Sequence, residues 1–163
     1  MVYEAKMAFF VRLAASRDGA ERLLDAQTIS VLGQCESLAA TAGPDSMSSG
    51  ALPLPGLADR ADYDDGSFLP SPLERHQSIV LPALQVVSAL VSTLGAQNTV
   101  AMAQARAFVA DQRDVILFAL GSVGTSLTFT AVYEVQLIAT IMRHVVRDVP
   151  DSEFVRLRGA RAS

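Results

Sequence analysis

The chain has 163 residues, half of them hydrophobic and 18% charged, and this composition supports a packed core and excludes global disorder. The net charge is −4, and basic residues cluster only near the C-terminal end (Arg156, Arg158 and Arg161), which argues against direct nucleic-acid binding. A single cysteine excludes an internal disulfide, and charged residues among the first 20 interrupt what would be the apolar core of a signal peptide.

The first predicted helical block covers residues 1–40. An apolar residue recurs there at helical spacing (Tyr3, Met7, Phe10 and Ala14). We expect Gly19 to supply the turn that ends this helix, followed by a short helix over residues 20–26. A further helix carries the apolar residues from Ile29 to Leu38, and Gly33 inside it indicates close packing.

Residues 41–71 differ in kind from the rest of the chain. They are rich in proline, glycine, serine and aspartate, and no helical period survives. A structureless stretch of this length is uncommon inside a compact domain, so we expect an external loop or a linker.

The second predicted helical block covers residues 72–150. It opens at Ser71, a candidate N-cap, with Pro72 at the first helical position and Glu74 completing a capping box. The helix that follows runs to Leu94 and is apolar around most of its circumference, which is typical of a helix buried from two sides.

Three further helices complete this block. Asn98 or Thr99 begins the first, a short helix covers residues 114–120 with Gly121 at its end, and the last runs from near Ser126 to Pro150. The last helix carries one apolar stripe (Ala131, Val135, Ile138, Met142, Val145 and Val149). Residues 151–163 form a C-terminal tail. The sequence therefore predicts an all-α protein.

A charge-free run over residues 77–105 is long enough to span a membrane. However, Pro82, Gly95 and several polar side chains interrupt it, and the bilayer core penalises broken backbone hydrogen bonding. The sequence favours buried helices, covered by protein, over a membrane span.

The acidic stretch over residues 59–66 invites a calcium-loop interpretation. Asp62 and Asp64 fit the alternating ligand positions, but Gly66 falls where a third ligand belongs. A solvated acidic loop is the better interpretation.

The remaining candidates for chemistry are two histidines and the cysteine. His76 and His144 lack a second histidine or cysteine at ligand spacing, and Cys35 lies on an apolar stripe typical of a buried structural thiol. We therefore predict no catalytic residue, no cofactor and no metal site. The helices also carry more apolar surface than a chain of this length can cover, which indicates a piece of a longer protein or a bound partner.

Several segments resemble known helical-repeat proteins. Residues 4–14 and 17–26 look like an armadillo-type repeat. The second block is more specific, and its motifs are Pro72-Leu73-Glu74-Arg75-His76, Leu81-Pro82-Ala83-Leu84-Gln85-Val86-Val87, Leu94-Gly95, Asn98-Thr99-Val100 and Phe108-Val109-Ala110-Asp111-Gln112. Together they resemble the very large scaffold nucleoporins of the nuclear pore inner ring, the group named for masses near one hundred ninety-two and two hundred five kilodaltons. The resemblance covers residues 3–39 and 72–120.

This resemblance implies an armadillo/HEAT-like α-solenoid segment of about six helices with one long loop. It implies a structural scaffold in the nucleus, at the nuclear pore complex, that binds linker nucleoporins and stacks on neighbouring repeats of the same parent protein. The family contributes no catalytic residues, so we expect no enzyme.

Two alternatives stay open at this point. A free-standing armadillo-like cytosolic adaptor would need polar outer faces on its terminal helices. The adjacent Phe9 and Phe10 of the first helix do not provide one, which favours a fragment. A small membrane-associated helical protein is the other alternative, which carbonate extraction would test.

Overall fold

A computed structural model of the chain describes residues 2–39, 72–122 and 128–147. These residues contain eight helices and no strand, which confirms the predicted all-α fold of an α-solenoid segment. The helices are α1 (Val2–Ala14), α2 (Arg17–Asp25), α3 (Thr28–Gly33), α4 (Glu36–Ala39), α6 (Pro72–Leu94), α7 (Thr99–Asp111), α8 (Arg113–Ser122) and α9 (Phe129–Arg147). The predicted loop over 41–71, with its acidic stretch, and the predicted tail over 151–163 lie outside the described residues.

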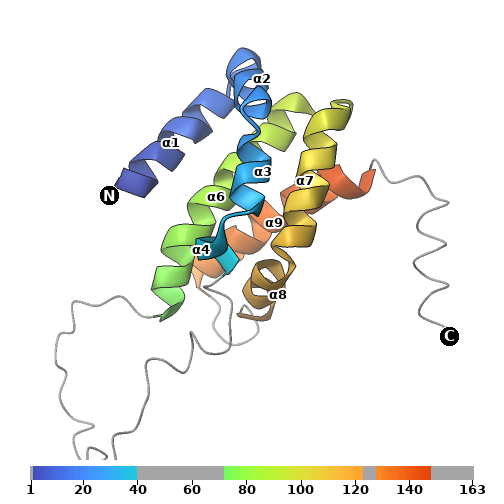
Figure 1. Cartoon of the computed structure of the whole chain (residues 1–163). Coiled ribbons are helices and arrows are strands. Elements are labelled where there is room, and N and C mark those ends of the chain that lie inside the picture. Colours follow the sequence, from blue (N-terminus) through green and yellow to red (C-terminus); the bar gives the residue numbers. More distant parts are fainter. Residues whose placement is uncertain (1, 40–71, 123–127, 148–163) are drawn as a thin grey trace, which may run out of the picture.

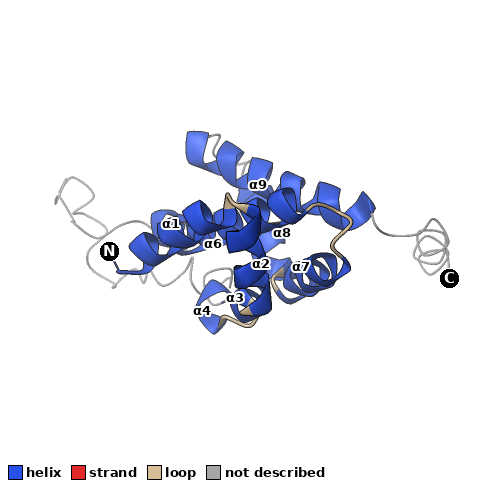
Figure 2. Cartoon of the chain, turned by 90° about the horizontal axis from the view of Figure 1, so that it is seen from above, coloured by secondary structure: helices blue, strands red, loops and turns tan. Residues whose placement is uncertain are grey.

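Helix α6 is the centre of the packing. It contacts α1 on one side and α9 on another, and also touches α2, α4 and α7 (Figures 1 and 2). The apolar residues predicted to form one stripe, from Val80 to Leu94, are mostly buried: Val80, Leu84, Val87 and Val91 are each at most 2% exposed, whereas Leu94 is half-buried. The two-sided burial expected from its composition is therefore confirmed.

The part of α6 from His76 to Leu94 is also the one helix of the described residues that is long and apolar enough to cross a membrane, by length and composition only. Half of this stretch is buried inside the molecule. A core helix of a soluble protein has the same length and composition, and α6 occupies the core position here.

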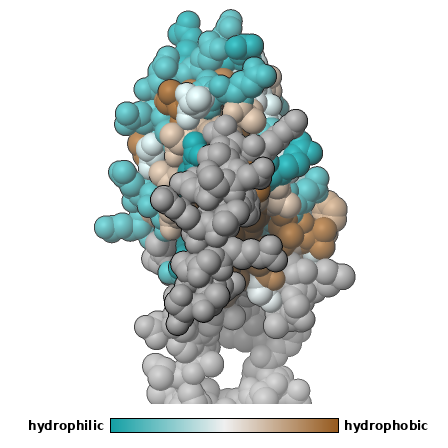
Figure 3. Space-filling view, turned by 90° about the vertical axis from the view of Figure 1, so that its right-hand side faces the viewer, coloured by the Kyte–Doolittle hydropathy of each residue, from teal (hydrophilic) through white to brown (hydrophobic). Residues whose placement is uncertain are grey.

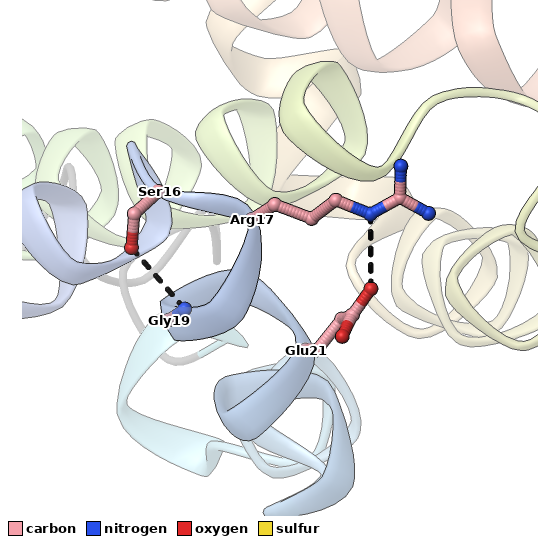
Figure 4. A network of polar contacts seen from close by, with 4 residues as sticks. All are labelled: Ser16, Arg17, Gly19 and Glu21. Atoms are coloured by element: carbon pink, nitrogen blue, oxygen red, sulfur yellow. Dashed lines mark hydrogen bonds and ion pairs between the residues drawn. The ribbon is translucent and has the colours of Figure 1, made fainter.

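The corner between α1 and α2 corrects one sequence prediction. Gly19 does not end the first helix: α1 ends at Ala14, and Gly19 is buried in the first turn of α2. The side chain of Ser16 begins α2 by accepting a hydrogen bond from the Gly19 amide at 3.2 Å, and Arg17 pairs with Glu21 one turn later (Figure 4). Glycine is needed here because a Cβ atom would collide with the Leu13 carbonyl oxygen.

A second correction concerns the predicted helix from Ile29 to Leu38, which divides into α3 and α4. In a continuous helix the Gly33 carbonyl oxygen would accept a hydrogen bond from a backbone amide of the next turn. Here it accepts a hydrogen bond from the Gln112 side chain at 2.6 Å. The close packing predicted at Gly33 is confirmed, because a Cβ atom there would lie 3.4 Å from the Phe108 Cα atom of α7.

The helix boundaries in the second block follow the predicted signals closely. Gly95 ends α6 with a φ of +73°, and Asn98 caps α7 by accepting a hydrogen bond from the Ala101 amide at 3.0 Å. Gly121, predicted to end α8, lies inside it instead. Helix α9 begins after Thr128, whose hydroxyl accepts from the Ala131 amide at 3.1 Å; the predicted start near Ser126 and end at Pro150 lie outside the described residues.

Candidate interaction surfaces

The residues weighed for chemistry do not come together as a site. Cys35 is half-buried between α3 and α4, with its Sγ atom 3.0 Å from the Ser37 hydroxyl, so it is more exposed than a fully buried structural thiol. His144 is half-buried on α9, whereas His76 is almost fully buried at the start of α6. Within residues 2–39, 72–122 and 128–147, no three side chains of the metal-binding types form a group.

His76 has a partner that the sequence analysis missed. Its Nε2 atom lies 3.3 Å from the Oε1 atom of Glu134 on α9, and the two side chains are only 2% and 1% exposed. The Phe118 ring of α8 packs against the imidazole in an edge-to-face arrangement, with ring centroids 4.8 Å apart. When His76 is protonated, this contact is a buried ion pair joining α6 to α9.

Glu134 could have been noticed from its spacing. It lies three residues after Ala131 and four before Ile138, so it falls on the buried stripe of α9. A carboxylate at such a position is almost never fully buried without a partner. Neither of its oxygens makes a hydrogen bond to another described residue, so His76 is its principal polar neighbour in that part of the chain.

Other seams between helices also carry side-chain contacts to the backbone. On the α1–α6 seam, the Tyr3 hydroxyl donates to the Ile79 carbonyl at 2.8 Å and the Thr93 hydroxyl donates to the Ala14 carbonyl at 2.7 Å. Burial, reinforced by the nearby Cys35, raises the pKa of Tyr3 to about 12. The phenol therefore stays protonated and acts as a donor throughout the neutral range.

A shallow groove of about 350 Å³ lies between α1, α4 and α6. It is lined by a mixture of polar and apolar side chains (Tyr3, Glu4, Ser37, Ser78 and Ile79). Its volume is within the range of small-ligand and peptide pockets, but it is open and its lining contains no pair of groups suited to acid–base chemistry.

The most exposed apolar surface of α9 lies on the face opposite its buried stripe. This outward stripe of α9 follows a three–four spacing (Phe129, Val132, Gln136, Ala139, Arg143 and Val146). Phe129 is 88% exposed and stacks on Tyr133 with ring centroids 6.5 Å apart, and Val132 is 47% exposed. On neighbouring α8, Leu117 and Leu120 are also exposed.

Apolar and polar residues are unevenly distributed over the surface. Figure 3 shows one face, on which the upper end is mainly hydrophilic while apolar residues gather lower down at one edge. Large contiguous exposed apolar patches on proteins are typical of interaction sites.

Comparison with known proteins identifies a family. Residues 1–142 match the family model described as nuclear pore complex scaffold, nucleoporins 186/192/205. The chain is 27% identical over 164 residues to the nuclear pore complex protein Nup205 of Homo sapiens, and 30% identical over 161 residues to that of Drosophila melanogaster. No solved structure matches.

Each of these alignments covers 96% of this chain but only 8% or 7% of the relative, so the chain spans a small part of the length of the curated relatives that it matches. The resemblance inferred from the sequence motifs is confirmed by a match over most of the chain. Its helices and the absence of strands in the described residues fit a solenoid scaffold. The chain belongs to the nuclear pore complex scaffold family of nucleoporins 186/192/205.

Proposed function

We propose that this chain is a structural segment of an inner-ring scaffold nucleoporin, which stacks helices into a longer rod and binds segments of linker nucleoporins. The observation that carries the proposal is the outward stripe of α9, which is apolar on the side that faces away from the core. The family match and the small share of each relative that the chain covers support it.

The outward stripe of α9 suits a stacking face. Helical repeats in a solenoid bury one face against the preceding layer and the other against the following layer, so each internal helix is apolar on two sides. Helix α9 has this character, because Arg143 is the only charged residue of its outward stripe. We propose that a further helical layer of the parent protein covers this stripe.

The groove between α1, α4 and α6 is the proposed site for a linker segment. Tyr3 and Ile79 offer apolar surface, while Ser37, Ser78 and Glu4 offer polar groups that can fix the orientation of a peptide. Such a mixture is typical of grooves that accept short segments of partner proteins. No catalytic role is proposed for any residue of this groove.

The free-standing adaptor has one observation in its favour. Every charged residue of α2 is exposed (Arg17, Asp18, Glu21, Arg22 and Asp25), as in a terminal cap. The same argument fails at α9, because a cap would carry charged residues where Phe129 and Val132 are exposed.

The test uses the 163-residue chain by itself. We expect it to bind the hydrophobic dye ANS and to self-associate at micromolar concentration in analytical ultracentrifugation. Replacing two stripe residues (Phe129→Glu with Val132→Lys) should reduce both signals. The matched control (Arg22→Gln with Asp25→Gln on α2), which is also neutral in net charge, should leave them unchanged. A wild-type chain that is monomeric and does not bind ANS would contradict the proposal.

A further inference from the structure

The His76–Glu134 contact is a feature of the core that helical stacking does not require. Two ionisable side chains are withdrawn from water there, and neither carboxylate oxygen makes a hydrogen bond to another described residue. Replacing a buried ion pair with apolar residues of similar volume is often neutral or stabilising. A gain in stability is therefore a weak explanation for this pair, and another role has to be considered.

Both α6 and α9 carry buried apolar residues that repeat at helical spacing. On α9 the buried residues recur every three or four positions (Ala131, Glu134, Ile138, Ile141 and Val145). Helix α6 carries buried aliphatic residues at the same spacing around its packed sides (Val80, Leu84, Val87 and Val91), and two of them, Val80 and Leu84, line a pocket with residues of α4, α7 and α8. Sliding α9 by one turn, about 5.4 Å, would replace one aliphatic contact with another, and hydrophobic contacts have little directionality.

Glu134 makes such a slide unfavourable. In a slipped register its carboxylate would remain inside the apolar seam but would leave the reach of His76, and an uncompensated buried charge is strongly destabilising. The second polar contact of this seam, from Gln85 Nε2 to the Tyr133 hydroxyl, is longer at 3.4 Å and only partly buried. It therefore discriminates less between registers than the buried pair does.

We propose that His76 and Glu134 select the register of α9 on α6 instead of adding to the stability of the fold. Phe118 of α8 contributes by packing against the imidazole in an edge-to-face arrangement, which restricts the directions from which a carboxylate can approach. Buried polar residues select the register of helix pairs in coiled coils by the same physical argument.

The register matters for the surface of the molecule. It decides the height along α6 at which Phe129 and Val132 are presented on the outward stripe of α9. This consequence for stacking rests on the proposed function, whereas the selection of register does not. The two can therefore fail separately.

The experiment compares four forms of the full 163-residue chain: wild type, His76→Leu, His76→Leu with Glu134→Leu, and the exchange His76→Glu with Glu134→His. Thermal unfolding followed by circular dichroism reports stability. Two-dimensional ¹H–¹⁵N spectra report whether the amides of α9 occupy one environment or several.

We expect His76→Leu alone to lower the unfolding midpoint by roughly 10 °C, because it leaves the carboxylate without its partner. The apolar double variant should recover at least the wild-type midpoint but show doubled or broadened amide signals along α9. The exchange variant should return these amides to a single set of signals.

Three results would overturn the proposal. One is an apolar double variant with a single sharp set of α9 signals, since no register would then have been lost. Another is a double variant that melts below His76→Leu, since the pair would then act through stability. The third is an exchange variant whose α9 signals are as heterogeneous as those of the apolar double variant. Dye binding and self-association of the wild-type chain test the proposed function independently of these results.

Discussion

Helices α2 and α9 both lie at the edge of the described fold, but they present opposite surfaces. Helix α2 buries Leu23 and Leu24 and exposes every one of its charged residues. Helix α9 buries Ile138 and Ile141 on one side and exposes Phe129 on the other. The first is a helix in contact with solvent, whereas the second has the composition of a helix with neighbours on both sides.

This difference distinguishes a surface suited to contact with solvent from a surface suited to contact with another helix. At the start of α2, the Ser16 side chain accepts a hydrogen bond from the Gly19 amide, and Arg17 forms an ion pair with Glu21 at the surface. The outward stripe of α9 has no comparable arrangement among the described residues, and Arg143 is its single charged residue. A scaffold segment needs both kinds of surface, one exposed to solvent and one that continues the stack.

The largest expected effect separates the two faces of α9. Ile141 is 2% exposed on the buried face, so Ile141→Ala should lower the free energy of unfolding by about 2–5 kcal/mol. The matched change on the outward stripe, Val132→Ala, should alter it by no more than about 0.5 kcal/mol, because half of that side chain is already in water. Urea denaturation of the two variants gives both values.

Equal losses from these two substitutions would break the comparison, because they would show that the outward stripe is packed as tightly in solution as the inner face. The slope of the denaturation curve provides a control, since an unchanged slope shows that both variants unfold from the same compact state.

The second effect compares two helical glycines. A Cβ atom at Gly19 would collide with the Leu13 carbonyl oxygen and crowd the Ser16 hydroxyl, so Gly19→Ala should destabilise the α1–α2 corner by about 1–3 kcal/mol. A Cβ atom at Gly121 meets no neighbour within 4 Å, so Gly121→Ala should stabilise α8 by about 0.5–1 kcal/mol. Relative to wild type, the thermal unfolding midpoint should fall for Gly19→Ala and rise for Gly121→Ala.

A Gly19→Ala variant as stable as wild type would show that α2 does not close against α1 as described. In that case the solvent-facing character of α2 would no longer contrast with α9.

Much of this fold can be predicted from local sequence signals, for a physical reason. Gly95 ends α6 and Asn98 begins α7, because a positive φ and a side-chain cap are properties of a few neighbouring residues. The burial of α6 can also be predicted from the sequence, because a helix that is apolar around most of its circumference has to be covered wherever it lies.

The errors at Gly19 and Gly121 concern helix ends, whereas two others occur where a distant residue decides the outcome. The break between α3 and α4 coincides with a hydrogen bond from Gln112 to the Gly33 carbonyl, two residues separated by 79 positions. Glu134 is tolerated on an apolar stripe because His76 reaches it from another helix. Periodicity describes one helix at a time, so it cannot show a partner on the next.

The smallest expected effect concerns the seam that holds α1 against α6. The pKa of Tyr3 is raised from its usual value near 10 to about 12 by burial, so the folded protein keeps this proton after the unfolded chain has lost it. The stability linked to this group is therefore fully present below pH 10 and decreases between about pH 10 and 12. Urea denaturation at pH 8 and pH 11 should show the decrease. Tyr3→Phe should show less of it, because the variant lacks the titrating hydroxyl and its bond to the Ile79 carbonyl at every pH. If wild type and Tyr3→Phe lost the same stability at high pH, the loss would come from other groups. Helix α1 would then be held against α6 by apolar packing and by the hydrogen bond from Thr93 to the Ala14 carbonyl.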